Sequence, residues 1–316
     1  MPGSGIRYVY IAGEGRSGST LLGQILNNLP DFHFVGEFRH LFYEPYGANY
    51  PCGCGKLFRD CGFWRGVMEA AFGSFEGIDR EALATCNFTV ARERFTPMLM
   101  LFNRAPAEFF SSRWRRAFED IILPLCRAIA RVSGKKVIVD SSHEPSQALV
   151  LARLPGIKLK VLHLVRDSRA VAFSSMRTKL TFDSGGERTY FPRKSPVTSA
   201  LGWDWRNLWA SRIAHLKRNS IAYARLRYED LIRTPAEALA GTLTRLGFPA
   251  QDLSFIDGAT VKLGINHALS GNTVKFNSGA VTLRMDDEWR HAMAQRDKRI
   301  TTLLTLPLLR RFGYAV

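Results

Sequence analysis

The chain has 316 residues, 46% of them hydrophobic and 23% charged, which is typical of a soluble protein long enough for one large α/β domain. Lysine and arginine outnumber aspartate and glutamate by 44 to 28, so the formal net charge is +16 and anionic partners are favoured. No zinc-finger spacing, RNA-binding signature or repeated basic helix occurs, so nucleic acid is not an expected partner.

The N-terminus and the hydropathy pattern predict a cytoplasmic protein. Residues 2–5 form a short polar lead into the first strand, where an export signal has a basic region and an apolar core. No run of about 18 apolar residues occurs, so no transmembrane helix is expected. The sequence carries no signal for the oligomeric state.

The first motif is a strand, a glycine loop and a helix. Residues 8–12 are apolar, β-branched or aromatic and predict a buried strand. Gly13, Gly15 and Gly18 then mark a tight loop, and leucine and isoleucine recur at helical spacing over residues 19–29. Such a loop directs backbone N–H groups and a helix dipole toward an anion. It predicts a phosphate-binding loop, and a plain connecting turn is the simpler alternative.

This loop almost matches the pattern G-x-x-x-x-G-K-[ST] of nucleoside-triphosphate enzymes. Gly13, Gly18 and Thr20 match the two glycines and the hydroxyl residue of this pattern, but Ser19 stands where the pattern has lysine. Since that lysine binds the β- and γ-phosphates, its absence argues against the usual triphosphate chemistry. The cation of this loop is Arg16.

Three of the five cysteines form a cluster. Cys52, Cys54 and Cys61 could bind a metal only with a fourth ligand, for which the nearby sequence offers His40 or Asp60. A reduced turn and a local disulfide are the alternatives. Because the ligand set is incomplete in the sequence, a structural role without a metal is favoured.

The later elements alternate between strands and helices. Helices are expected at 64–71, 80–83, 109–131 with an interruption or kink at Pro124, 146–153, 169–176, 201–218 and 235–246, and strands at 136–140, 159–165 and 221–226. This alternation predicts a parallel sheet with helices on both faces. Because ligands bind beyond the carboxyl ends of such strands, the glycine loop, residues 140–143 and residues 166–174 are expected at one edge.

Two later segments are expected on the acceptor side. Residues 178–199 are polar and broken by glycine and proline, which predicts a mobile loop that covers an acceptor. The helix after it carries Trp203, Trp205 and Trp209. These could form an acceptor wall, although aromatic residues at this spacing more often belong to a core.

Four motifs follow one another between residues 8 and 289. Residues 15–21 read Gly-Arg-Ser-Gly-Ser-Thr-Leu, residues 164–174 contain Arg166 at a strand end and Ser174 eight positions later, residues 226–231 contain Tyr228, and residues 271–289 contain Lys275. Together they resemble the sulfotransferases that use 3′-phosphoadenosine 5′-phosphosulfate (PAPS). Residues 34–39 and 52–64 are most similar to the bacterial and, more distantly, the carbohydrate-type members.

The resemblance implies an α/β protein with one domain over residues 1–316, in which a central parallel sheet is flanked by helices in a P-loop-NTPase-like sulfotransferase fold. Segments 38–130 and 178–218 would be acceptor-side insertions. The implied donor-binding residues are Gly15, Arg16, Ser17, Gly18, Ser19 and Thr20 for the 5′-phosphosulfate, Arg166, Ser174 and Lys275 for the 3′-phosphate, and Tyr228 near the adenine. The product would be 3′-phosphoadenosine 5′-phosphate (PAP), and no metal is required.

The resemblance also names the catalytic candidates, which are Arg16, Glu37 and His143. Arg16 would stabilise the charge that develops during transfer. Glu37 stands where the family has a catalytic carboxylate, and His143 echoes the strand-end histidine of the cytosolic enzymes, so we expect Glu37 to be the base and His143 to contact the leaving group or acceptor. The reverse assignment stays open.

The acceptor would be the hydroxyl or amine of a small molecule, a glycan or a lipid. Two other functions remain as alternatives. One is a P-loop kinase of a small molecule, and the other is a non-catalytic module that binds nucleotides or polyanions.

Overall fold

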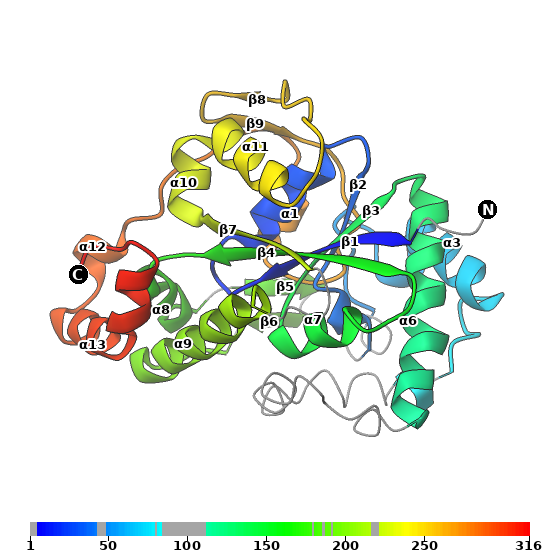
Figure 1. Ribbon diagram of the computed structural model, residues 1–316, viewed down its shortest axis with the longest axis horizontal. Helices are drawn as coiled ribbons and strands as arrows, with labels where there is room; N and C mark the ends of the chain where they lie inside the picture. Colours follow the sequence, from blue (N-terminus) through cyan, green and yellow to red (C-terminus); the bar gives the residue numbers. More distant parts are fainter. Residues whose placement is uncertain are drawn as a thin grey trace.

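The computed structural model describes residues 5–42, 49–79, 81–83, 112–178, 180–184, 187–190, 192–215 and 221–316. Its centre is a five-stranded sheet in the order β2-β3-β1-β4-β7, in which all neighbouring strands are parallel (Figure 1). The strands are β1 (Ile6–Ala12), β2 (Phe32–Gly36), β3 (Val137–His143), β4 (Ile157–Val165) and β7 (Ala222–Arg227). The predicted parallel sheet is therefore confirmed.

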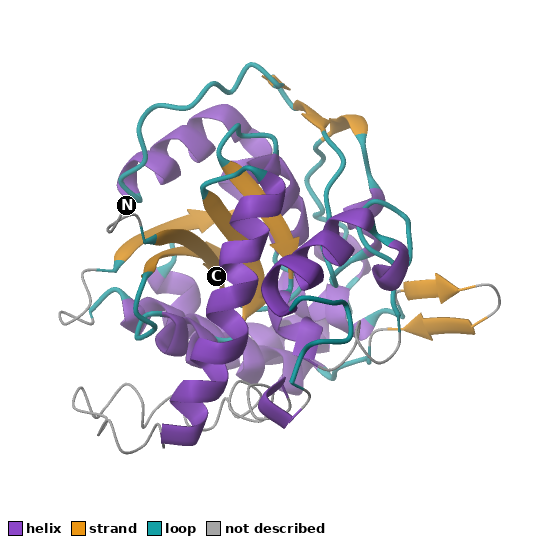
Figure 2. Cartoon of the chain, turned by 90° about the vertical axis from the view of Figure 1, so that its right-hand side faces the viewer, coloured by secondary structure: helices purple, strands orange, loops and turns teal. Residues whose placement is uncertain are grey.

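Both faces of this sheet are apolar, because alternate residues of each strand point to opposite sides. Tyr8 and Tyr10 of β1 pack on one face, whereas Val9 and Ile11 pack on the other. The first face is covered by α3 (Gly62–Phe72), α6 (Ser112–Ser133), α7 (Pro145–Leu151) and the end of α9 (Pro196–Ile213). The second is covered by α1 (Ser19–Asn27), α10 (Tyr228–Arg233), α11 (Pro235–Arg245) and β9 (Thr260–Leu263) (Figure 1). Figure 2 shows helices on both sides of the central strands.

Smaller elements complete the described part of the chain. They are η1 (Phe38–Phe42), η2 (Phe58–Asp60), α8 (Ser168–Met176), β5 (Leu180–Ser184), β6 (Glu187–Tyr190), β8 (Ile256–Asp257), η4 (Thr273–Phe276), β10 (Gly279–Thr282), α12 (Trp289–Ala292) and α13 (Gln295–Arg311). Strands β8, β9 and β10 form an antiparallel sheet. Among the described helices, none is long and apolar enough to cross a membrane.

The structure differs from the sequence-based expectation in three places. Strand β2 was not predicted, and helix α6 continues through Pro124, where an interruption or a kink was expected. The segment expected to be a loop, residues 178–199, contains the antiparallel hairpin of β5 and β6 and the start of α9 at Pro196. Leu180 and Phe182 alternate with polar residues before a Gly-Gly pair, which is a pattern typical of a hairpin. The polar composition of the whole segment nevertheless led to the prediction of a loop.

Candidate active site

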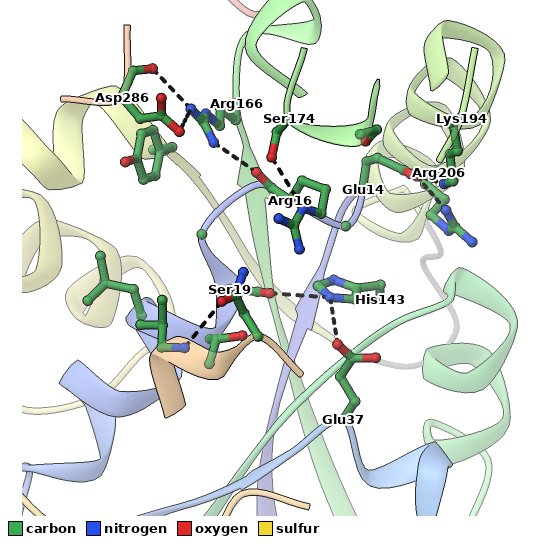
Figure 3. A pocket seen from close by; sticks show the side chains of 18 of the residues that line it. Glu14, Arg16, Ser19, Glu37, His143, Arg166, Ser174, Lys194, Arg206 and Asp286 are labelled. Carbon is green, nitrogen blue, oxygen red and sulfur yellow. Dashed lines mark hydrogen bonds and ion pairs between the residues drawn. The ribbon is translucent and has the colours of Figure 1, made fainter. Parts of the chain in front are cut away.

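A cavity of about 570 Å³ lies at the carboxyl edge of the central sheet. Each parallel strand supplies a lining residue at or directly after its end: Glu14 follows β1, Glu37 follows β2, His143 ends β3, Arg166 follows β4 and Tyr228 follows β7 (Figure 3). The predicted meeting of the glycine loop with the ends of β3 and β4 is therefore confirmed. The sequence pattern located this edge because the carboxyl ends of parallel strands always meet.

The glycine loop is closely packed against the strands beside it. Gly13 has φ +132°, and a Cβ there would lie 2.2 Å from the carbonyl oxygen of Leu164. Gly18 has φ +92°, and a Cβ there would lie 2.7 Å from the ring of Tyr228. A side chain at Gly13 would require a backbone shift, and one at Gly18 would displace the ring of Tyr228 and strain the backbone at its positive φ. The loop therefore directs Gly18 and the start of α1 into the cavity.

Two arginines and a serine form one cationic wall of the cavity. Arg16, in the left-handed conformation at φ 67°, donates from Nε to Ser174 Oγ at 3.2 Å. Arg166 donates from Nη1 to the carbonyl oxygen of Arg16 at 3.0 Å. Burial, and then the neighbouring charge of Arg166, lower the pKa of Arg16. Two guanidinium groups held this close favour an anion between or beside them.

Arg166 is held from three sides. Its Nη2 lies 2.9 Å from Asp286 Oδ2, and its guanidinium lies over the ring of Tyr228 at 4.5 Å from the centroid. The indole N–H of Trp203 donates to the backbone carbonyl of Arg166 at 2.9 Å. These contacts fix the guanidinium in a fork geometry that suits a phosphate.

Glu37 and His143 face each other across the opposite side of the cavity (Figure 3). Glu37 Oε1 lies 3.9 Å from His143 Nε2, and Glu37 Oε2 lies 2.9 Å from His40 Nε2. His143 Nε2 is also 3.2 Å from Ser19 Oγ. Ser19, which stands at the lysine position of the triphosphate pattern, therefore links the phosphate loop to a catalytic candidate.

The surroundings of this pair set its charge at neutral pH. Burial alone would raise the pKa of Glu37, but the hydrogen bond and charge of His40, with the charge of His143, lower that pKa to about 2. Burial lowers the pKa of His143 to about 4, although the charge of Glu37 opposes this shift. At pH 7 the pair is thus a carboxylate and a neutral imidazole, and both can accept a proton.

Glu14 is a buried cavity residue that the sequence did not single out. Its carboxylate lies 3.0 Å from Lys194 Nζ and accepts a hydrogen bond from Arg206 Nη1. It joins the loop after β1 to the segment before α9 and to α9 itself. No local pattern indicates these ion pairs, because the partners of Glu14 follow 180 and 192 residues later.

The structure brings most of the predicted site residues to the cavity. Those that line it are Gly15, Arg16, Gly18, Ser19, Thr20, Glu37, His143, Arg166, Ser174 and Tyr228. Ser17 is buried within the loop and is not among the cavity-lining residues of the described chain. The described lining also includes Leu21.

Lys275 does not reach the cavity, contrary to expectation. It is buried, and its Nζ donates to the carbonyl oxygens of Pro51 at 2.8 Å and Leu269 at 3.3 Å. Its neighbours Asn272 and Val274 line the cavity instead. A lysine in a loop carries no periodicity that could have shown which way it points.

The three tryptophans of α9 do not form an acceptor wall in the described structure. Trp203 is fully buried, and Trp205 and Trp209 pack edge to face at 5.6 Å. None of the three is among the described residues that line the cavity. The core interpretation of this spacing is the one that the structure supports.

The fold and the site are those of a phosphate-loop α/β protein, and comparison with known proteins identifies its family. A family model described as the sulfotransferase family matches residues 9–252. The chain therefore belongs to the sulfotransferase family. A comparison with curated proteins gave no match.

Solved structures agree at the level of the fold. The sulfotransferase domain from the Synechococcus PCC 7002 olefin synthase is 20% identical, with 98% of this chain and 95% of that chain covered and a TM-score of 0.51. The sulfotransferase domain from the curacin biosynthetic pathway is 15% identical, with both chains fully covered and a TM-score of 0.46. The first of these supports the P-loop-like sulfotransferase fold.

Proposed function

We propose that this sulfotransferase moves a sulfuryl group from PAPS to a hydroxyl or amine of its acceptor and releases PAP. The observation that carries the proposal is the cationic wall of Arg16, Arg166 and Ser174 beside a glycine loop that lacks the triphosphate lysine. This wall and the loop amides provide two adjacent positions for anionic groups. PAPS carries two such groups, a 5′-phosphosulfate and a 3′-phosphate.

The donor would lie along the carboxyl edge of the sheet. The amides of residues 15–20 and the start of α1 suit the 5′-phosphosulfate, since unpaired N–H groups and the helix dipole favour an anion there. Arg166 and Ser174 suit the 3′-phosphate, because a fixed guanidinium binds phosphate through two parallel hydrogen bonds. Arg16 lies between the two groups and would stabilise the charge on the leaving oxygen.

Glu37 is the base in this proposal, and His143 contacts the leaving group or the acceptor. His143 lies between Glu37 at 3.9 Å and the phosphate loop at Ser19, at 3.2 Å, so it can reach both reacting partners. The pKa order, about 2 for Glu37 and about 4 for His143, favours the opposite assignment, because the group with the higher pKa is the stronger base. A pH–rate profile distinguishes the two.

The acceptor would enter from the side of segments 38–130 and 178–218. In the described parts of these segments, Arg39, Lys194 and Arg206 line the cavity, where they pair with the carboxylates of Glu14 and Glu144. This wall of paired charges suits an acceptor with polar groups, whether a small metabolite, a glycan or a lipid headgroup. No part of this chemistry requires a metal at the cavity. A cytoplasmic location remains a prediction.

The test is a transfer assay with PAPS labelled in its sulfur, offered to a panel of phenols, amines, glycans and lipid headgroups. We expect label in at least one acceptor class and an equal amount of PAP released. The kinase alternative predicts turnover of ATP with Mg²⁺ and none of PAPS. The non-catalytic alternative predicts that PAPS binds without transfer, and that Glu37→Ala and His143→Ala change nothing.

A further inference from the structure

Three cysteines and a histidine come together outside the cavity. Cys52, Cys54 and Cys61 lie in the loop that leads into α3, and His267 follows β9, 206 residues beyond Cys61. The four ligand atoms all lie within 4.8 Å of one another. Cys52 and Cys61 are buried, and the other two are half-buried. The structure thus supplies, in His267, the fourth ligand that the local sequence did not.

Four of the six distances between the ligand atoms are close to those of a tetrahedral metal site, and the other two are at most 4.8 Å. Cys61 Sγ lies 3.6 Å from Cys52 Sγ and 3.7 Å from Cys54 Sγ. His267 Nδ1 lies 3.4 Å from Cys61 Sγ and 3.6 Å from Cys52 Sγ. A tetrahedron built on Zn–S of about 2.3 Å and Zn–N of about 2.1 Å has edges of about 3.8 Å between sulfurs and about 3.6 Å from sulfur to nitrogen. A disulfide needs sulfurs about 2.05 Å apart.

We propose that Cys52, Cys54, Cys61 and His267 bind one zinc ion in a closed structural site. Thiolate and imidazole ligands in a tetrahedral set select zinc among the common divalent ions. Because the protein provides all four ligands, no position is left for water or substrate. The site does not depend on the proposed sulfuryl transfer.

The backbone around the ligands is held in place by contacts that do not involve the ligand atoms. The N–H of Gly53 donates to the carbonyl oxygen of Ala268 at 2.9 Å. The indole N–H of Trp64 donates to the backbone carbonyl oxygen of His267 at 2.9 Å. A Cβ at Gly53 would lie 2.1 Å from Asn266 Oδ1, so the two segments approach as closely as a glycine allows. The loop and the segment of His267 are therefore already in the geometry that the ion requires.

Two further features suit a thiolate–imidazole site. Cys61 is the N-cap residue of α3, where the helix dipole stabilises a thiolate. The ring of His267 stacks on Phe63, with 4.7 Å between centroids and an interplanar angle of 14°. That stacking fixes the ring plane, so that Nδ1 points at the sulfurs.

The position of the site explains what the ion would do. His267 lies a few residues before Asn272 and Val274, which line the cavity, and Lys275 donates to the carbonyl oxygen of Pro51, next to Cys52. Zinc would therefore fasten the loop after β2 to the segment that forms one wall of the cavity. Loss of the ion would loosen that wall without removing any group that touches the donor.

The test measures zinc in the full-length chain, produced without a polyhistidine tag, and in three variants. We expect about one zinc per chain in the wild type and in Asp60→Asn, and none in His267→Ala. His267→Cys should keep the ion as a four-cysteine site. Replacement of the zinc by Co²⁺ should give the intense visible absorption bands of a tetrahedral cobalt–thiolate site in the wild type. The bands should be shifted in His267→Cys.

Asp60→Asn is the matched control, because Asp60 is the ligand that the nearby sequence offered and it lies beside Cys61. Zinc loss in Asp60→Asn with retention in His267→Ala would overturn the assignment of His267. A wild-type chain that binds neither ion after reduction, or whose intact mass shows a disulfide among the three cysteines, would overturn the site. If His267→Ala does not fold, the metal content and cobalt spectrum of His267→Cys decide.

Discussion

Glu37 and His143 are the two residues whose roles a single experiment can separate. The wild-type kcat/KM should stay level near neutral pH and fall as the pH drops through about 4, because the proton that His143 gains there adds a charge that lowers the basicity of Glu37. Loss of the base costs about 10²- to 10⁴-fold in rate. We therefore expect Glu37→Gln to lose activity by that factor at every pH, whereas His143→Gln should lose about tenfold and lack the fall near pH 4.

The control for this pair is the affinity for PAP, which Glu37→Gln should not change by more than about threefold, since Glu37 does not belong to the cationic wall or to the phosphate loop. Complete loss of activity in His143→Gln beside a mild loss in Glu37→Gln would reverse the two roles. The measurement is the initial rate of PAP release over a pH series, with saturating donor.

Among single residues, the sequence patterns located those that follow a predicted strand. They did not locate residues whose partners are distant in sequence. Arg166 was found because it directly follows a predicted strand, so the sheet edge determines where it lies. Glu37 was named from the family resemblance, and the structure places it directly after β2. The direction of Lys275 depends on the backbone of an irregular segment, and it points to Pro51, away from the cavity. Glu14 carries no local sequence signal, because its two cationic partners are distant in sequence.

Among the elements, the ion pairs of Glu14 hold the loop after β1 to α9. Glu14 is 1% exposed, and the charges of Arg206 and Lys194 lower its pKa against the effect of burial. Glu14→Gln would leave both cations facing a neutral amide. We expect a loss of about 2 kcal/mol in the free energy of unfolding, below the value for a fully buried pair because both cations are partly exposed.

Urea denaturation of Glu14→Gln measures this loss. Glu237→Gln, an exposed residue in the first turn of α11, is the control and should stay within about 0.5 kcal/mol of the wild type. Equal stability of both variants would show that the pairs of Glu14 do not stabilise the fold.

The hairpin of β5 and β6 shows why element prediction failed in this part of the chain. Composition suggested a loop, and the short alternation in Leu180 and Phe182 was too brief to outweigh it. Four of the five strands of the central sheet were predicted, because each of them is a mostly apolar run of five or more residues between clear breaks, whereas β2 was not predicted. Periodicity is decisive only over such lengths.

For the whole molecule, buried neutral histidines make stability depend on pH. Burial lowers the pKa of His143 to about 4 and that of His163 to about 4, both below the value of about 6.5 expected in the unfolded chain. Between these values the unfolded state binds more protons. The contribution of these histidines to the free energy of unfolding should therefore be complete above pH 6.5. It should fall toward pH 4 by about 1.4 kcal/mol per pH unit for each histidine.

Urea denaturation at a series of pH values between about 7 and 5 measures this slope. His163 is hydrogen-bonded to Tyr223 and Asn207 between β4, β7 and α9, away from the cavity. His163→Gln should reduce the slope even if it also lowers the overall stability. An equal slope in the wild type and in His163→Gln would contradict the neutral state of His163.

The overall fold followed from local patterns, and the zinc site did not. The alternation of strands and helices was enough to predict a parallel sheet, because each crossover connection leaves few other arrangements. His267 lies 206 residues from Cys61, and only the packed structure brings them together. The cysteine spacing alone therefore gave an incomplete ligand set.

The most direct test of the proposed donor site compares PAP with adenosine 5′-monophosphate by calorimetry, because the two ligands differ only in the 3′-phosphate. Charge-assisted hydrogen bonds from Arg166 and Ser174 are worth about 1.5–3 kcal/mol each. The wild type should therefore bind PAP at least about tenfold more tightly. In Arg166→Ala this preference should largely disappear, while binding of the monophosphate is unchanged. Equal affinity of the wild type for both ligands, or an undiminished preference in Arg166→Ala, would contradict the assignment of this cavity to a 3′-phosphorylated donor.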